Sequence, residues 1–190
     1  MKTIYLIHGW DGSPKEPMHQ WIKTQLEQKG YTVIIPKMPD PEVPKIETWI
    51  PFLTEIILNL DENSYLIGHS VGCQAVLRFM ETLPEEIKLS GVILIAPWMH
   101  LDEQTIKDEG EEIVEIAKPW METPIDWKKV KSHTNNFTCL LSDNDPYVPL
   151  SNKELFEKSL NAKIIIEKNK GHYTEDDSII ENQTVIDLIR

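Results

Sequence analysis

The stretch YLIGHSVGCQAVLRFM, residues 65–80, changes its pattern at one serine. Three apolar residues lead into the motif GHSVG, centred on Ser70, and the residues after it have helical spacing. The chain has only 8 glycines, and two of them flank this serine. A turn of this kind between a strand and a helix exposes a serine hydroxyl above a sheet edge, because glycines have no Cβ to clash. The stretch favours an α/β fold with Ser70 as a nucleophile; the alternative is close strand-helix packing alone.

Short apolar runs rich in branched residues recur on both sides of this stretch. Such runs are typical of strands buried on both faces of a parallel sheet. Segments with helical spacing lie between them, for example Met18, Ile22 and Leu26 before Gly30. The alternation predicts a three-layer α/β sandwich, with about six mostly parallel strands and helices on both faces. The expected strands are 3–7, 31–36, 65–68, 91–96, 137–141 and 162–167.

Further helices are predicted from apolar spacing and end signals. One covers about Glu47–Leu60, with Pro51 tolerable only in its first turn. Another starts at Ser70 and ends before Pro84. The residues of the first that we expect to face inward are Trp49, Leu53, Ile56, Ile57 and Leu60.

Two helices are expected near the C-terminus. Ser151 and Glu154 have the spacing of a capping box, which predicts a helix start at Ser151. The last helix is expected over about Thr174–Arg190, where the acidic residues 175–177 suit the positive end of a helix dipole.

The segment 97–131 interrupts the alternation of strands and helices. It mixes tryptophans with the acidic run KDEGEEIVEI and is too long for an ordinary loop. We expect a helical insertion over one edge of the sheet, within a single domain covering residues 1–190. Trp98, Trp120 and Trp127 either line an acyl pocket or bury the insertion, and the sequence favours neither.

Composition restricts the partners. The chain has 19 lysines and arginines against 31 aspartates and glutamates, a formal charge of -12, which repels nucleic acid and anionic lipid surfaces. The first residues, MKTIYLIHGW, contain an apolar run too short for a signal sequence or a membrane span. We therefore expect a cytoplasmic protein that acts on a small molecule, without nucleic acid or membrane partners; the oligomeric state stays open.

An acid and a histidine follow two later strands. SDNDPYVP comes after the strand at 137–141, and NKGHYTEDD comes after the strand at 162–167. The carboxyl ends of parallel strands share one sheet edge, where such folds keep their sites. A serine nucleophile needs a base and an orienting acid, which predicts a triad of Ser70, Asp145 and His172. Asp143 competes for the acid role, but Pro146 favours Asp145 by fixing its loop.

The oxyanion of an acyl-transfer reaction needs backbone donors. The helix after Ser70 presents the N–H of Val71, and the loop HGWDGS presents that of Trp10. His8 and Gly9 are then expected to shape this loop without a catalytic role for His8.

The remaining histidines and cysteines are expected to be structural. His19, His69, His100 and His133 contain no His-x-x-x-His pair, so we expect neither a metal site nor a cofactor. Cys73 follows Ser70 by one turn, but helix packing is favoured over a nucleophilic role because no cationic loop accompanies it.

Four segments together resemble a known family. MPDPEVPKIETWIPFLTE, YLIGHSVGCQAVLRFMET, KPWMETPIDWKKVK and SDNDPYVP are similar to the small single-domain serine hydrolases grouped with retinoblastoma-binding protein 9, a branch of the α/β-hydrolase fold. The resemblance implies a compact hydrolase with six or so parallel strands, no separate lid domain and a triad of Ser70, Asp145 and His172. It also implies esterase-like or aminopeptidase-like activity. The Leu-x-Cys-x-Glu motif of the mammalian namesake is absent, so its partner binding is not expected here.

Three functions compete on these observations. The first is hydrolysis of a small carboxylic ester or amide through an acyl-enzyme on Ser70. The alternative is a non-catalytic binding or regulatory protein on a hydrolase scaffold, since a fold does not determine a function. Three intact triad positions argue against it. A nucleotide-binding domain is disfavoured because both glycine-rich phosphate motifs are missing.

Overall fold

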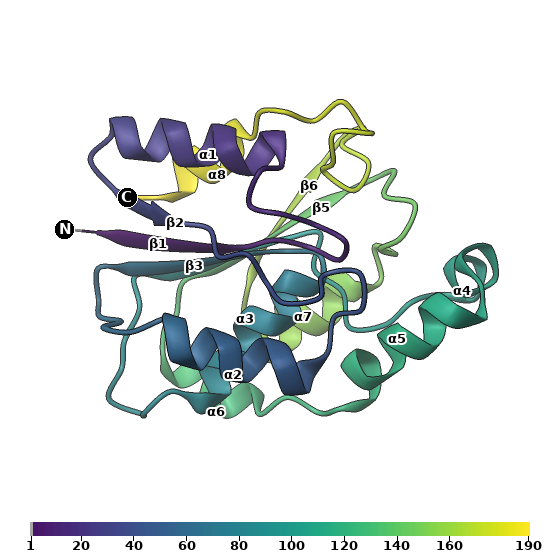
Figure 1. Cartoon of the computed structure of the whole chain (residues 1–190), viewed down its shortest axis with the longest axis horizontal. Coiled ribbons are helices and arrows are strands. Elements are labelled where there is room, and N and C mark those ends of the chain that lie inside the picture. The colour runs from purple at the N-terminus through teal and green to yellow at the C-terminus, as the bar shows by residue number, and fades with distance from the viewer. Residues whose placement is uncertain (1) are drawn as a thin grey trace.

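Six parallel strands form one sheet at the centre of the molecule, in the order β2-β1-β3-β4-β5-β6 (Figure 1). The computed structural model describes residues 2–190. The chain first builds outward from β1 to β2 and then crosses to β3 on the other side of β1, which is the topological switch of an open α/β sheet. The strands are β1 (Thr3–Ile7), β2 (Thr32–Ile34), β3 (Ser64–His69), β4 (Gly91–Ile95), β5 (Phe137–Ser142) and β6 (Lys163–Glu167).

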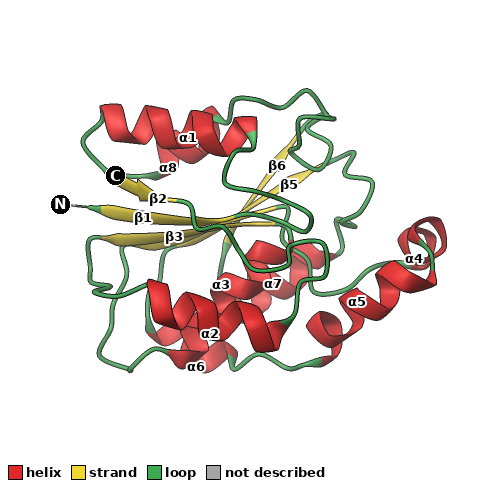
Figure 2. Ribbon diagram, viewed as in Figure 1, coloured by secondary structure: helices red, strands yellow, loops and turns green. Residues whose placement is uncertain are grey.

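Helices cover both faces of this sheet, which confirms the predicted three-layer sandwich (Figure 2). One face carries α1 (Pro17–Gln28) and α8 (Gln183–Leu188). The other carries α2 (Ile46–Ile56), α3 (Val71–Thr82), α6 (Trp127–Ser132) and α7 (Asn152–Leu160). Two more helices, α4 (Glu103–Glu109) and α5 (Glu111–Glu122), extend to one side of these layers. Among residues 2–190, no helix has both the length and the apolar character that a membrane span requires.

The central strands and α3 form the core. Every residue of β3, β4 and β5 is buried, as is every residue of α3 from Val71 to Met80. Burying one large aliphatic side chain contributes about 1.5–3 kcal/mol. The apolar runs were therefore good strand predictors, because both faces of these strands are covered. The edge strands differ: β2 is three residues long, and Ile166 of β6 is 44% exposed.

Two details of α2 differ from the prediction. Pro51 lies inside the helix and beyond its first turn, since α2 begins at Ile46. Proline removes the N–H that would bond the carbonyl of Glu47, but Pro51 and Glu47 are both exposed, so this carbonyl is open to water. The helix also ends at Ile56, which is 36% exposed, whereas Ile57 and Leu60 face the core from beyond its end.

The predicted helix start at Ser151 is confirmed, because Ser151 is the residue directly before α7, but two other predictions about the C-terminal helices are wrong. Ser151 precedes α7, but its hydroxyl pairs with Nε2 of His100 at 2.9 Å and caps no helix N–H, so the capping box does not form. The last helix, α8, covers only Gln183–Leu188, and the acidic residues 175–177 lie in turns before it.

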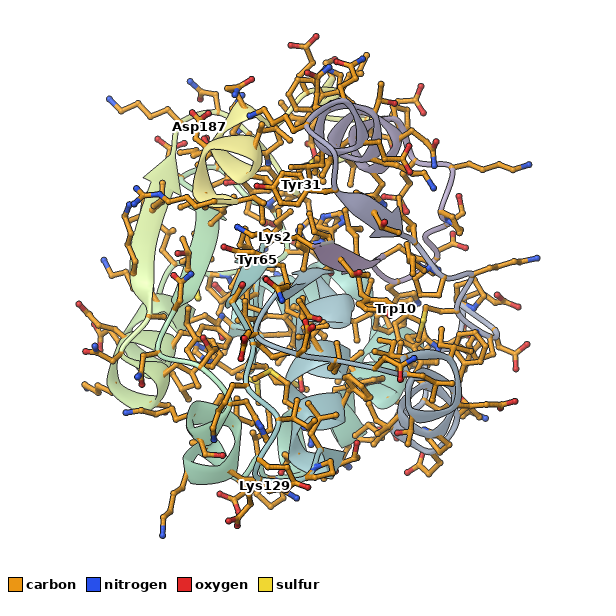
Figure 3. The ribbon with its side chains drawn as sticks, turned by 90° about the vertical axis from the view of Figure 1, so that its left-hand side faces the viewer. Lys2, Trp10, Tyr31, Tyr65, Lys129 and Asp187 are labelled. Atoms are coloured by element: carbon orange, nitrogen blue, oxygen red, sulfur yellow. The ribbon has the colours of Figure 1, made fainter. Side chains whose placement is uncertain are left out.

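The C-terminal residue is held by hydrogen bonds at the end of the sheet where the strands begin. The hydroxyl of Tyr65 donates to the backbone oxygen of Arg190 at 3.2 Å, and the ammonium of Lys2 contacts the same oxygen. Lys2 also lies over the ring of Tyr31, at 5.9 Å from its centroid. Figure 3 shows Lys2, Tyr31 and Tyr65 gathered on this side of the molecule. The opposite, carboxyl end of the sheet is left for the loops that carry the candidate site.

A buried arginine joins α3 to the helices between β4 and β5. Arg78 is 4% exposed, and its guanidinium donates to the carbonyls of Trp120, Thr123 and Pro124 at 2.7–3.4 Å. These carbonyls lie at and just beyond the C-terminal end of α5, where a helix has no donors of its own. The guanidinium also lies 5.9 Å from the ring centroid of Trp120.

Replacing Arg78 with methionine is expected to lower the free energy of unfolding by about 2–4 kcal/mol, because it leaves the buried carbonyl of Trp120 and the partly buried carbonyls of Thr123 and Pro124 without their donor. Urea unfolding of the two proteins measures this difference. Lys128→Met is the control: Lys128 is exposed on α6, and its replacement should change the same quantity by less than about 0.5 kcal/mol. An Arg78→Met protein as stable as the wild type would mean that the hydrogen bonds of Arg78 to the end of α5 do not stabilise the fold.

Candidate active site

Ser70 occupies a strained turn between β3 and α3. Its backbone has φ 53° and ψ −124°, in a region that non-glycine residues rarely adopt. Its N–H donates to the carbonyl of Ile95, and its carbonyl accepts from the N–H of Cys73, both at 2.9 Å. A Cβ on Gly72 would lie 2.4 Å from the carbonyl oxygen of Ile7, and one on Gly68 would lie 2.6 Å from the backbone of Cys73. Gly68 and Gly72 therefore allow α3 to pack closely on β1 and β3, and the same close packing holds Ser70 in its strained turn.

The structure brings the three residues of the predicted triad together. Oγ of Ser70 lies 2.9 Å from Nε2 of His172. On the other side of the ring, Nδ1 of His172 lies 2.8 Å from Oδ2 of Asp145 and 3.1 Å from Oδ1. The Asp145 side chain is 1% exposed, that of His172 is 11% exposed, and Ser70 as a whole residue is 8% exposed. The arrangement is a continuous hydrogen-bonded chain from hydroxyl to imidazole to carboxylate.

The two aspartates after β5 have separate structural tasks. Oδ1 of Asp145 also accepts from the N–H groups of Tyr147 and Val148, at 2.9 and 3.0 Å, which orients the carboxylate. Asp143 accepts from the N–H of Asn169 at 2.8 Å and holds the two loops together. Only Asp145 reaches the imidazole of His172.

The loop that carries His172 is folded around Asp177. One carboxylate oxygen of Asp177 accepts from the N–H of His172 at 2.8 Å and from the N–H and hydroxyl of Thr174 at 3.1 and 2.7 Å. Gly171 has φ +51°, and a Cβ there would collide with the Asp177 carboxylate. These hydrogen bonds lower the pKa of Asp177 despite partial burial. The acidic residues 175–177 had instead been expected at the start of a helix. The Thr174-x-x-Asp177 spacing was the available sign of a side chain turned back onto the loop.

A cavity of about 780 Å³ opens above Ser70. Its apolar wall includes Trp98 after β4 together with Leu101, Ile113 and Ala117. Trp98 therefore faces this cavity. The other two candidate tryptophans do not line it: Trp120 is fully buried and donates to the carbonyl of Pro44, and Trp127 packs on Phe156.

Val71 and Trp10, the residues predicted to supply the oxyanion donors, lie in the same region as Ser70. Val71 is the first residue of α3, so its N–H has no acceptor within the helix. The loop after β1 passes so near that a Cβ on Gly9 would lie 3.1 Å from Cβ of Ser70, and Trp10 lines the same cavity. His8 shapes this loop, because its Nε2 accepts from the N–H of Met38 at 3.1 Å.

Three titratable side chains gather behind the serine. Burial and the nearby charge of His172 lower the pKa of His69 to about 4. Burial also lowers the pKa of His19 far below its usual range, so both rings are neutral at pH 7. Burial raises the pKa of Glu16, which lines the cavity. His-x-x-x-His spacing does not reveal this group, since it combines Glu16 and His19 at the start of α1 with His69 at the end of β3.

Cys73 is a core thiol. It is fully buried, and its Sγ donates to the carbonyl of Ile95 at 3.2 Å. Burial raises its pKa well above the usual range, so the nucleophilic thiolate does not form at neutral pH. This agrees with the packing role favoured from the sequence.

Comparison with known proteins gives consistent results. The chain is 27% identical over 188 residues to the YdeN protein of Bacillus subtilis (strain 168), covering 99% of this chain and 94% of that protein. It is 29% identical over 167 residues to the serine hydrolase RBBP9 of Rattus norvegicus, covering 87% and 78%. The crystal structure of the B. subtilis ydeN gene product superimposes with a TM-score of 0.88, at 27% identity and over 100% of this chain and 97% of that one.

The structural likeness confirms the predicted fold class, a parallel α/β sheet of the hydrolase type. The family model described as "Serine hydrolase" matches residues 4–189, from the second residue of β1 to the residue after α8. Because this match covers almost all of the sequence, the chain belongs to the serine hydrolase family.

Proposed function

We propose that the protein hydrolyses a small carboxylic ester or amide, with Ser70 as nucleophile, His172 as general base and acid, and Asp145 as the carboxylate that orients the histidine. The observation that carries this proposal is the unbroken contact from Oγ of Ser70 through the His172 ring to Asp145, at 2.9 and 2.8 Å. Serine hydroxyls are poor nucleophiles at neutral pH unless a base accepts their proton.

The protonation states follow from the contacts. A carboxylate only accepts, so the Nδ1 that faces Asp145 carries a proton. In a neutral ring Nε2 is then free to accept the Ser70 proton. As the Ser70 oxygen attacks the carbonyl carbon, its proton moves to Nε2, and the imidazolium formed is stabilised by Asp145. The same proton next goes to the leaving alcohol or amine, and water completes the cycle by attacking the acyl-enzyme on Ser70.

The N–H groups of Trp10 and Val71 are proposed to stabilise the oxyanion. Donors at such positions are worth roughly 3–4 kcal/mol each, because they bind the charge that develops only in the transition state. Their proximity to Ser70 supports this role: Val71 follows it directly at the start of α3, and the Gly9-Trp10 loop packs against it.

The cavity supports a substrate with a compact acyl group. Trp98, Leu101 and Ile113 supply an apolar wall near the serine, and the volume of about 780 Å³ is within the range of small-molecule sites. The names of the relatives agree with hydrolysis but state no substrate. The alternative, a non-catalytic binding protein, is not favoured, because such a protein has no need of a strained Ser70 aligned with two further residues.

A fluorophosphonate probe tests the proposal directly. This reagent phosphonylates an activated serine and releases fluoride, so the folded protein should take up one probe per chain. Mass spectrometry of the digest should place the adduct on the peptide that contains Ser70. Heat-unfolded protein is the control and should stay unlabelled, because unfolding separates Ser70 from His172. Folded protein that does not react, or that reacts at another residue, would contradict the proposed nucleophile.

A further inference from the structure

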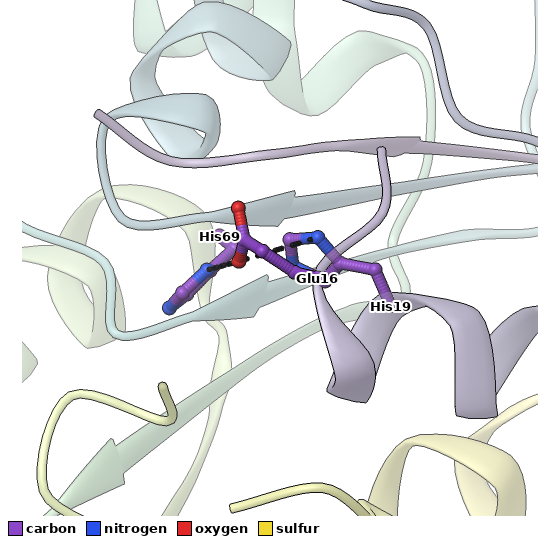
Figure 4. A group of neighbouring side chains, drawn as sticks. All are labelled: Glu16, His19 and His69. Carbon is purple, nitrogen blue, oxygen red and sulfur yellow. Dashed lines mark ion pairs between the residues drawn. The ribbon is translucent and has the colours of Figure 1, made fainter. Parts of the chain in front are cut away.

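Glu16, His19 and His69 form a compact group (Figure 4). Glu16 precedes α1, His19 lies in the first turn of that helix, and His69 ends β3. Oε2 of Glu16 lies 3.5 Å from Nδ1 of His19 and 3.8 Å from Nδ1 of His69. One ligand atom from each of the three residues lies within 4.8 Å of the others.

His19 is an unusual core residue. It is fully buried, and neither of its ring nitrogens has a hydrogen-bond partner within residues 2–190. The Ser13 carbonyl is near enough to oppose the lowering of the His19 pKa, but it is outside hydrogen-bonding geometry. A buried polar nitrogen without a partner destabilises the fold, because it has lost its hydrogen bond to water. The nitrogen nearest Glu16 lies 3.5 Å from the carboxylate oxygen, which is too distant for a strong hydrogen bond.

The hydrogen bond on the far side of His69 determines its tautomer. Nε2 of His69 lies 2.8 Å from the backbone carbonyl of His172, which can only accept, so Nε2 carries the proton. In a neutral ring Nδ1 is therefore a bare lone pair, and it has no hydrogen-bond donor among the described residues. This lone pair faces the Glu16 carboxylate, so two electron-rich groups oppose each other across 3.8 Å. A cation between them would remove this repulsion.

We propose that Glu16, His19 and His69 bind a divalent transition-metal ion, with zinc as the ion that fits best. Two neutral imidazoles and one carboxylate form a donor set that zinc accepts, at about 2.0–2.2 Å from each donor atom. Such bond lengths place the donors of a tetrahedral site roughly 3.3–3.5 Å apart. The distances from Oε2 of Glu16 to the two histidines, 3.5 and 3.8 Å, are at or slightly above this value, and all three ligand atoms lie within 4.8 Å of one another. Small side-chain shifts would therefore complete the site.

The surroundings meet two further requirements of a metal site. The hydrogen bond from Nε2 of His69 to the carbonyl of His172 is the kind of outer contact that orients a ligating histidine. Glu16 and His69 both line the cavity above Ser70, which offers the ion an entry path and a water ligand. A bound ion would tie the start of α1 to the end of β3 and, through that carbonyl, to the His172 loop.

Zinc titration of tag-free protein, after removal of metals by a chelator, tests this site. Calorimetry should show one saturable zinc site per chain. Cobalt should bind in competition with zinc and give the intense visible absorption of a four-coordinate ion. Zinc at about 100 times its Kd should raise the melting temperature by roughly 5–10 °C, because the ion binds the folded chain only.

Glu16→Gln is the main variant, because the amide keeps the oxygen that accepts from the N–H of Ser13 and removes the charge. It should weaken zinc binding by roughly 100-fold or more, since even outer contacts are worth 10- to 100-fold. His19→Gln should do the same where it folds. His100→Ala, which removes a histidine far from the group, and His172→Ala, which removes the ring nearest the serine, should both bind zinc like the wild type.

Three outcomes would overturn the proposal. The wild-type protein could show no saturable zinc site, or Glu16→Gln could bind zinc as tightly as the wild type. A loss of zinc binding in His172→Ala would place the ion on His172 instead. Unchanged zinc binding in Glu16→Gln is the result expected if a water molecule or a shared proton, and not a metal ion, lies between Glu16 and the two histidines. The site differs from the sequence-based expectation of no metal ligands, which rested on histidine spacing alone.

Discussion

Replacing Ser70 with alanine is expected to lower kcat/KM for a small ester by about 10⁴- to 10⁶-fold. The change removes the one oxygen that lies 2.9 Å from Nε2 of His172. The remaining machinery then acts only by binding substrate and stabilising the oxyanion, and such residual catalysis is far below that of an intact triad. Alanine keeps the Cβ of serine, so the cost of the positive φ at position 70 is unchanged.

The controls for this variant separate chemistry from folding. The melting temperature of Ser70→Ala should lie within a few degrees of the wild type, because Ser70 contributes one hydrogen bond near the surface of the cavity. Ser13→Ala removes another hydroxyl from the same cavity, one that only accepts from the N–H of Lys15. Its kcat/KM should change by less than about tenfold. A Ser70→Ala protein that keeps a tenth of the activity, or an equal loss in Ser13→Ala, would contradict the nucleophile assignment.

The parts of the fold that were predictable from the sequence are those governed by burial on both sides. The runs at 65–68, 91–96 and 137–141 became β3, β4 and β5, because central strands of a covered parallel sheet need apolar residues at every position. At the edges this requirement weakens. The strand predicted at 31–36 therefore corresponds to only the three residues of β2 in the structure.

The residues of the candidate site were predictable where their positions follow from the order of the strands in the sheet. Ser70, Asp145 and His172 each follow a parallel strand at the same sheet edge, and chain order then suggests how they meet. The contacts that support them were not predicted, because they come from side chains that turn back on their own loops. Asp177 illustrates this: its neighbours in sequence look like a helix start, yet its carboxylate holds the N–H of His172.

Two further predictions failed, one about an exposed part of the backbone and one about side chains that different helices and strands bring together. Pro51 was expected in a first turn, but exposed helix carbonyls can bond water, so the helix passes through it. Glu16 and His19 lie three residues apart at the start of α1, whereas His69, at the end of β3, joins them only in the folded chain. Spacing rules within one segment cannot detect a group of that kind.

Asp145→Asn is expected to lower kcat/KM by about 10⁴-fold with little change in geometry. The orientation of the new amide follows from the loop. The N–H groups of Tyr147 and Val148 both donate to Oδ1, so the amide oxygen must stay there and the amide nitrogen must take the place of Oδ2. That nitrogen would donate to Nδ1 of His172 across 2.8 Å. The ring proton is then forced onto Nε2, which can no longer accept the proton of Ser70.

Asp143→Asn provides the matched control, because it removes the same charge two residues away. The amide oxygen at position 143 can still accept from the N–H of Asn169, so the two loops should stay together. We expect kcat/KM to fall by less than about tenfold, since Asp143 does not contact the ring of His172. Steady-state rates on a nitrophenyl ester measure both variants. Equal losses in the two proteins would mean that local charge, and not the tautomer of His172, governs the rate; a larger loss in Asp143→Asn would transfer the orienting role to Asp143.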